Sequence, residues 1–176
     1  GSEMCIRDRG SADQLIERLI SEGGNSPADI LFTVDAGRLH RAKVAGILQP
    51  IESKILSENI PPSMRDEDDY WFGLTVRARV LVYSKERVTP DQLSTYEDLA
   101  NRKWRGKIAV RSSSNIYNQS LMASIIASNG SRKALTWAKS IRKNMARAPR
   151  GSDRDQARAV AAGLADVAIM NTYYLG

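Results

Sequence analysis

The sequence has 176 residues, a net charge of +6 and 42% hydrophobic residues, which fits one globular domain or parts of two. No apolar run reaches the roughly 18 residues that a membrane-spanning helix needs, and the basic residues are spread out, which argues against a nucleic-acid-binding protein. The single cysteine, Cys5, excludes an internal disulfide framework, and the single histidine, His40, argues against a zinc site or a Ser-His-Asp triad.

The start of the chain shows no periodic pattern that fits the rest of the sequence. Residues 4–9 read MCIRDR, which looks like translated adaptor sequence from assembled environmental reads. We therefore predict that residues 1–10 are not native, and that the native protein is truncated here at both ends.

The first half of the chain alternates predicted helices with apolar segments. A helix begins at Ser11, which forms a capping box with Gln14, and ends near Gly23. The apolar run at 29–34 predicts a buried strand. Further along we expect a helix at 35–46, a short helix at 52–62 and a long β-prone stretch at 70–84.

The second half continues the alternation. A strand is expected before the serine-rich turn, and the last strand covers the apolar run ADVAIM. The intervening helices are expected at 115–130, 131–146 and 152–163, the last capped by Ser152. This order predicts an α/β fold with mostly parallel strands and helices on both faces.

Ligands of such folds bind beyond the carboxyl ends of the strands. One such place is the segment from Ser112 to Asn115, where hydroxyl groups open a helix and could cradle an anion. The alternative is simple helix capping by Ser113 or Ser114. Tyr117 lies close enough to face the same ligand, or else packs in the core.

The last strand leads into a pair of adjacent tyrosines, Tyr173 and Tyr174. In a strand their side chains would point to opposite faces, but in a turn both hydroxyl groups can reach one point. Ionised phenols are hard oxygen ligands, and a trivalent cation would favour their ionisation. The alternative is that both rings pack against the surface of a lobe.

Two arginines, Arg77 and Arg79, are spaced to face one side of a strand. They could hold a carboxylate or phosphate, form a solvated strand face, or pair with Asp35 or Glu97. His40 is expected on a helix surface and not as a ligand.

Three stretches, 27–51, 71–127 and 165–176, together resemble the periplasmic ferric-iron-binding proteins, which are the substrate-binding components of iron(III) ABC transporters. The resemblance extends in order over residues 11–176. It implies a two-lobed periplasmic-binding-protein-like fold of type II, with residues 11–82 in the first lobe and 83–176 in the second.

The resemblance also implies roles for individual residues. Tyr173 and Tyr174 match the twin phenolate ligands of Fe(3+), and Tyr117 matches a further tyrosine ligand. Arg77 matches an arginine that balances phenolate charge. Residues of the serine-rich turn match an anion-binding position used by other branches: Ser112, Ser113, Ser114 and Asn115.

The implied function is periplasmic binding of ferric iron and its delivery to an inner-membrane permease, without catalysis. A signal peptide upstream, a monomeric state and a possible synergistic anion are part of this expectation, and no nucleic acid is involved. The first strand of the family, which carries a histidine or tyrosine ligand, has no counterpart here. Two alternatives are a binding protein for a small organic or inorganic anion on the same fold, and a hydrolase or transferase using Ser112–Ser114.

Overall fold

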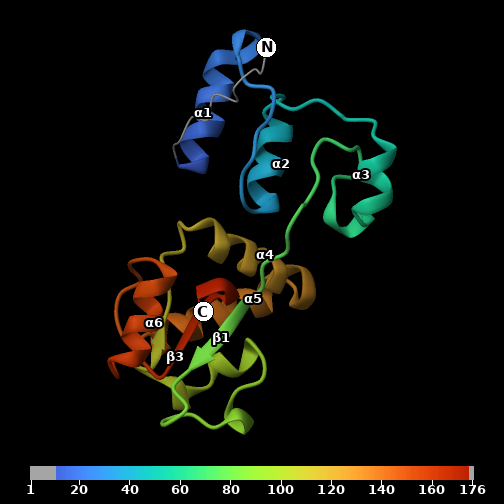
Figure 1. The fold of residues 1–176 in the computed structure, drawn as a ribbon. Helices are drawn as coiled ribbons and strands as arrows, with labels where there is room; N and C mark the ends of the chain where they lie inside the picture. The colour runs from blue at the N-terminus through green and yellow to red at the C-terminus, as the bar shows by residue number, and fades with distance from the viewer. Residues whose placement is uncertain (1–10, 175–176) are drawn as a thin grey trace. The chain divides into compact units, whose positions relative to one another are not determined.

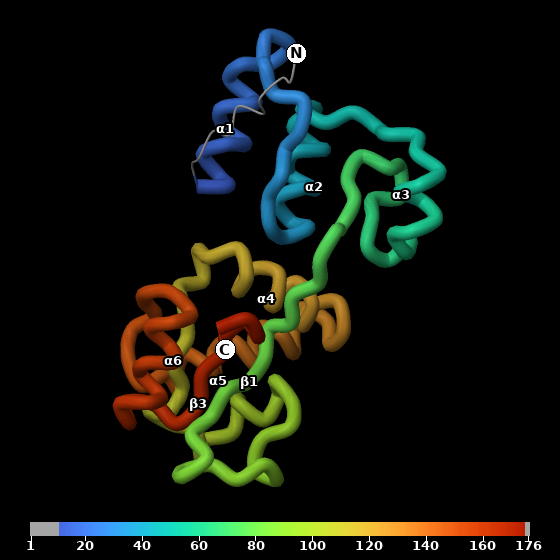
Figure 2. The backbone as a smooth tube through the Cα atoms, viewed as in Figure 1, coloured from blue at the N-terminus to red at the C-terminus, as the bar shows by residue number. Residues whose placement is uncertain are grey.

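The structure is a computed structural model that describes residues 11–174 (Figures 1 and 2). Its contacts divide the chain into two compact units, with the division between Val76 and Arg77. The predicted lobe limits at 82 and 83 stay predictions, as does the foreign origin of residues 1–10, which lie outside the described residues. Among the described residues, no helix has the length and apolar character needed to cross a membrane.

The first unit is built from three helices: α1 (Ala12–Glu22), α2 (Ala36–Val44) and α3 (Lys54–Asn59). The predicted capping box of α1 is confirmed, because Ser11 and Gln14 each accept a hydrogen bond from the backbone N–H of the other. Asp13 of α1 forms ion pairs with Arg38 and Arg41, which tie α1 to α2.

The predicted strand at 29–34 is wrong. The segment pairs with no other strand in the described part of the chain, and Ile30 and Phe32 are 82% and 76% exposed. A strand is held by backbone hydrogen bonds to a neighbouring strand, and an apolar composition does not supply that neighbour.

The second unit contains a three-stranded sheet in the order β1-β3-β2. Its neighbouring strands β1 and β3 are labelled in Figure 1. Its strands are β1 (Arg79–Tyr83), β2 (Ile108–Ala109) and β3 (Val167–Asn171). β2 runs parallel to β3, but β1 is antiparallel to it, so the expectation of a mostly parallel sheet is only half met. In this antiparallel register Arg79 faces Asn171, which brings the start of β1 to the end of β3.

The central strand β3 is buried along its whole length. Its alternate side chains point to opposite faces. Val167 and Ile169 pack in a core with Ile141 of a long helix, whereas Ala168 packs with Ala159 and Val160. Helices therefore cover both faces, as predicted: α4 (Ile116–Asn129), α5 (Ser131–Asn144) and α6 (Asp153–Ala161).

Short 3₁₀ segments connect these elements in both units. The last of them follows β3 directly, at the red end of the tube in Figure 2, and it carries the two adjacent tyrosines according to its residues Thr172–Tyr174. The segments are Gly23–Asn25, Pro62–Met64, Pro90–Gln92, Glu97–Ala100, Arg102–Trp104 and Thr172–Tyr174.

Candidate functional site

The twin tyrosines lie in a turn and not in a strand. β3 ends at Asn171, and Thr172–Tyr174 form one 3₁₀ turn. The rings of Tyr173 and Tyr174 are therefore neighbours, with centroids 4.3 Å apart and planes tilted by 41°. This is the arrangement in which both hydroxyl groups reach one region.

Tyr117, in the first turn of α4, reaches the same region. The side chains of Tyr117 and Tyr174 both lie close enough to the Tyr173 hydroxyl to lower the pKa of Tyr173. The guanidinium of Arg77 donates to the Tyr117 hydroxyl at 3.4 Å. Three phenol oxygens from two distant parts of the sequence thus converge, with a cationic side chain beside them.

Guanidinium groups also lie over the phenol rings. The Cζ atom of Arg77 is 5.2 Å from the ring centroid of Tyr173, and that of Arg154 is 5.7 Å from the ring of Tyr174. Arg111 is 5.5 Å from the ring of Tyr117. Such contacts place positive charge against the negative face of each ring, and they favour negative charge on the phenol oxygens.

The two neighbouring phenols have different acidities. Burial raises the pKa of Tyr173, but hydrogen bonds from Tyr174, Asn171 and Tyr117 and the charge of Arg77 outweigh burial, so its pKa lies below the ordinary value of 10.0. The hydrogen bond to Tyr173 raises the pKa of Tyr174 to about 12, and burial acts in the same direction. Tyr173 is therefore the phenol of the pair that ionises first.

The serine-rich turn is held together by hydrogen bonds between its own residues. The hydroxyls of Ser112 and Ser114 share a hydrogen bond of 2.8 Å, and the backbone N–H of Ser114 donates to Ser112. Asn115 caps α4 by accepting from the N–H of Tyr117, so capping by Ser113 or Ser114 is wrong. The turn that Ser112 closes makes Asn115 the last residue before the helix. The anion-binding role of these residues stays a prediction.

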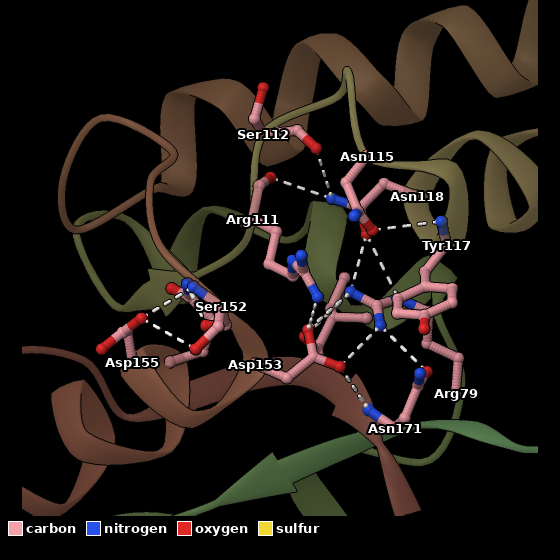
Figure 3. A network of polar contacts seen from close by, with 12 residues as sticks. Arg79, Arg111, Ser112, Asn115, Tyr117, Asn118, Ser152, Asp153, Asp155 and Asn171 are labelled. Atoms are coloured by element: carbon pink, nitrogen blue, oxygen red, sulfur yellow. Dashed lines mark hydrogen bonds and ion pairs between the residues drawn. The ribbon is translucent and has the colours of Figure 1, made fainter. Parts of the chain in front are cut away.

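Arg77 and Arg79 have separate environments. Arg77 is exposed beside the phenols, whereas Arg79 is part of a buried polar network (Figure 3). The partner of Arg79 is Asp153, at 3.1 Å, so the expected pairing with Asp35 or Glu97 is wrong for this residue.

Asp153 is the centre of this network and is fully buried. Besides Arg79, it pairs with Arg111 at 3.5 Å and accepts a hydrogen bond of 3.0 Å from the backbone N–H of Asn171. Asn118 accepts from Arg79 on the other side, at 2.8 Å. The sequence signal for these residues was weak: Asp153 is typical of the first turn of a helix, and Asn171 stands out only as the polar residue that ends an apolar run.

Within residues 11–174, no group of three or more His, Cys, Asp or Glu side chains is arranged to hold a metal ion. His40 is exposed on α2, as expected of a surface residue. The converging phenols offer oxygen atoms, which are the ligands that suit a hard cation.

Residues 25–175 match the family of bacterial extracellular solute-binding proteins. The chain belongs to this family. Its members are solute-binding proteins, in agreement with the prediction that the chain is not an enzyme.

Several relatives of this chain are iron proteins by name. The chain is 53% identical to iron uptake protein A1 of Synechocystis over 95% of its own length and 46% of the relative. It is 27% identical to an Fe(3+)-binding periplasmic protein of Serratia marcescens, covering 99% of the chain and 50% of the relative. The chain thus spans about half the length of these curated relatives.

A solved structure of a Trichodesmium protein (IdiA, FutA) in complex with iron and citrate ligands matches with a TM-score of 0.91 and 57% identity. The match covers 94% of this chain and 52% of that one. The predicted α/β class and the two-lobed type II fold are confirmed by this similarity.

Proposed function

We propose that the chain is part of a binding protein that carries ferric iron, held by the phenolate oxygens of Tyr117, Tyr173 and Tyr174. The observation that carries this proposal is the convergence of three phenol side chains: Tyr117 and Tyr174 both act on the hydroxyl of Tyr173, and Arg77 donates to that of Tyr117. The names of relatives as iron uptake and Fe(3+)-binding proteins support the same ligand.

The chemistry of the site suits this cargo. Ferric iron is a hard cation that prefers oxygen ligands, and a bound cation lowers the pKa of its ligands. Three phenolates balance the charge of Fe(3+), and Arg77 then offsets a further anionic ligand. An anion bound with the metal would lie at Ser112–Asn115, and the citrate in the Trichodesmium structure makes such an anion a reasonable partner.

The family also supports a proposal for the wider role. We propose that the whole protein works in the periplasm, as a monomer, and delivers iron to the permease of an ABC transporter. The periplasmic location given in the name of the Serratia relative supports this assignment. Reduction to Fe(2+), or docking to the permease, would release the metal.

The test is a titration of the chain with ferric citrate, followed by visible absorption. Iron–phenolate coordination gives a charge-transfer band, which Tyr173→Phe and Tyr174→Phe should abolish and Tyr117→Phe should weaken. Tyr83→Phe is the matched control, because Tyr83 lies at the far end of β1, opposite Val167. A colourless protein that binds citrate equally well in all variants would instead favour the small-anion alternative.

A further inference from the structure

Asn171 connects the buried network to the phenols. It is 3% exposed and lies two residues before Tyr173. Its side-chain carbonyl accepts from Nη1 of Arg79 at 3.0 Å, and its side-chain NH₂ donates to the hydroxyl of Tyr173 at 3.2 Å. Its backbone N–H donates to Asp153 (Figure 3).

The direction of the Asn171 amide is dictated by its neighbour. A guanidinium group has donors and no acceptor, so the carbonyl oxygen of Asn171 must face Arg79. The NH₂ group then has to face Tyr173. Rotation of the amide by half a turn would place the NH₂ group of Asn171 against the N–H donors of Arg79.

Arg79 cannot move away to allow that rotation. Its Nη1 and Nη2 atoms lie 3.1 and 3.4 Å from the two oxygens of the fully buried Asp153. Its Nε and Nη2 also donate to Asn118 at 3.2 and 2.8 Å. Moving Arg79 away would break its ion pair with the buried Asp153 and its hydrogen bonds to Asn118, which is costly.

We propose that Asn171 is a positioning residue for Tyr173, locked by the Asp153–Arg79 pair so that its amide can only donate to the phenol oxygen. The inference rests on the proposed function. The hydrogen bond fixes where the Tyr173 oxygen lies before iron arrives. It persists in the iron-bound state, where it draws electron density from the phenolate.

The first arm of the test needs no iron. In an NMR spectrum of the iron-free chain, Tyr173→Phe should shift the side-chain NH₂ resonances of Asn171 and leave those of Asn118 in place. Asn118 is a suitable reference because its NH₂ group donates to the carbonyls of Arg111 and Ser112 and not to a phenol. Unchanged Asn171 resonances would overturn the inference.

The second arm compares two isosteric substitutions, Asn171→Asp and Asn118→Asp. Both place a carboxylate on Arg79, but only the first removes the donor to Tyr173. Without that donor the phenolate is more electron-rich, so the charge-transfer band of the ferric citrate-loaded chain should move to longer wavelength. Iron should also pass to excess EDTA about tenfold faster, the size expected for one hydrogen bond to a charged group.

Asn171→Ala, which introduces no charge, should shift the band in the same direction and guards against a folding defect of Asn171→Asp. A band and a rate unchanged in both Asn171 variants would overturn the inference, as would an equal shift in Asn118→Asp. No band in the unsubstituted chain would overturn the proposed function. In that case the NMR arm still decides whether Asn171 holds Tyr173.

Discussion

The carboxylate of Asp153 and the guanidinium of Arg79 form an ion pair of 3.1 Å whose side chains are 0% and 9% exposed. The pair joins the start of α6 to the start of β1, residues that are 74 positions apart. Burying two charges is unfavourable unless each finds further hydrogen bonds, and here Arg111 and Asn171 supply them.

Removing the carboxylate of Asp153 should therefore destabilise the second unit strongly. Asp153→Ala leaves two guanidinium groups without their counter-ion, and we expect a loss of about 3–5 kcal/mol in the free energy of unfolding. Urea denaturation measures it. Asp91→Ala, on an exposed 3₁₀ segment, is the control and should cost about 0.5 kcal/mol or less. Equal losses in the two variants would contradict the structural role of Asp153.

A second carboxylate should make stability depend on pH. Burial raises the pKa of Asp166, but hydrogen bonds from Lys107 and Arg87, at 2.9 and 2.8 Å, outweigh burial and hold the pKa below 3.8. The unfolded chain therefore binds a proton at a higher pH than the folded one. The stabilisation is complete above the unfolded pKa and is lost as the pH falls through the lower folded value.

Denaturation of the chain and of Asp166→Asn between about pH 6 and 2 tests this linkage. The variant should be less stable at neutral pH, and the difference should shrink as the pH falls below the unfolded pKa of the carboxylate. A difference that stays constant with pH would mean that charge is not the cause.

The ion pairs between α1 and α2 should contribute little by comparison. Hydrogen bonds from Arg38 and Arg41 lower the pKa of Asp13 to about 2, but this side chain is 51% exposed. We expect Asp13→Asn to cost about 0.5–1 kcal/mol at low salt, and less in about 1 M salt, which screens exposed charges. Glu17→Gln, on the same helix, is the control. A loss that is insensitive to salt would argue for packing instead.

Gly73 should tolerate no side chain. A Cβ atom there would lie 2.7 Å from the carbonyl oxygen of Met64, which already accepts a 2.8 Å hydrogen bond from the N–H of Gly73. Gly73→Ala should lower the free energy of unfolding of the first unit by about 1–3 kcal/mol, the usual cost of overpacking. Gly24→Ala meets no atom within 4 Å and should be nearly neutral in thermal unfolding.

Local features of the fold followed from the sequence. The caps at Ser11 and Ser152 and the end of α4 at Gly130 depend on neighbours a few residues away. The segment at 29–34 did not follow, because a strand needs a partner that no local pattern specifies. The antiparallel direction of β1 could not be predicted either, because it depends on its pairing with β3.

In the candidate site, too, local sequence patterns do not specify contacts between distant residues. The tyrosines and Arg77 were singled out by their residue types and by the family resemblance, and their roles as ligands stay predictions. Asp153 and Asn171 were not singled out, because each looks ordinary within its own element. Their importance arises only when Arg79 reaches both of them from a different strand.

The antiparallel pairing of β1 with β3 also sets how this unit responds to force. The chain enters β1 beside the point where it leaves β3, since Arg79 is opposite Asn171. Tension between residues 77 and 174 would load the hydrogen bonds one pair at a time, peeling the strands apart from that end. A sheet loaded in this unzipping geometry has little resistance to force. A pulling force on the chain would therefore separate Arg77 from Tyr173 before it disturbed the pairing of Tyr83 with Val167.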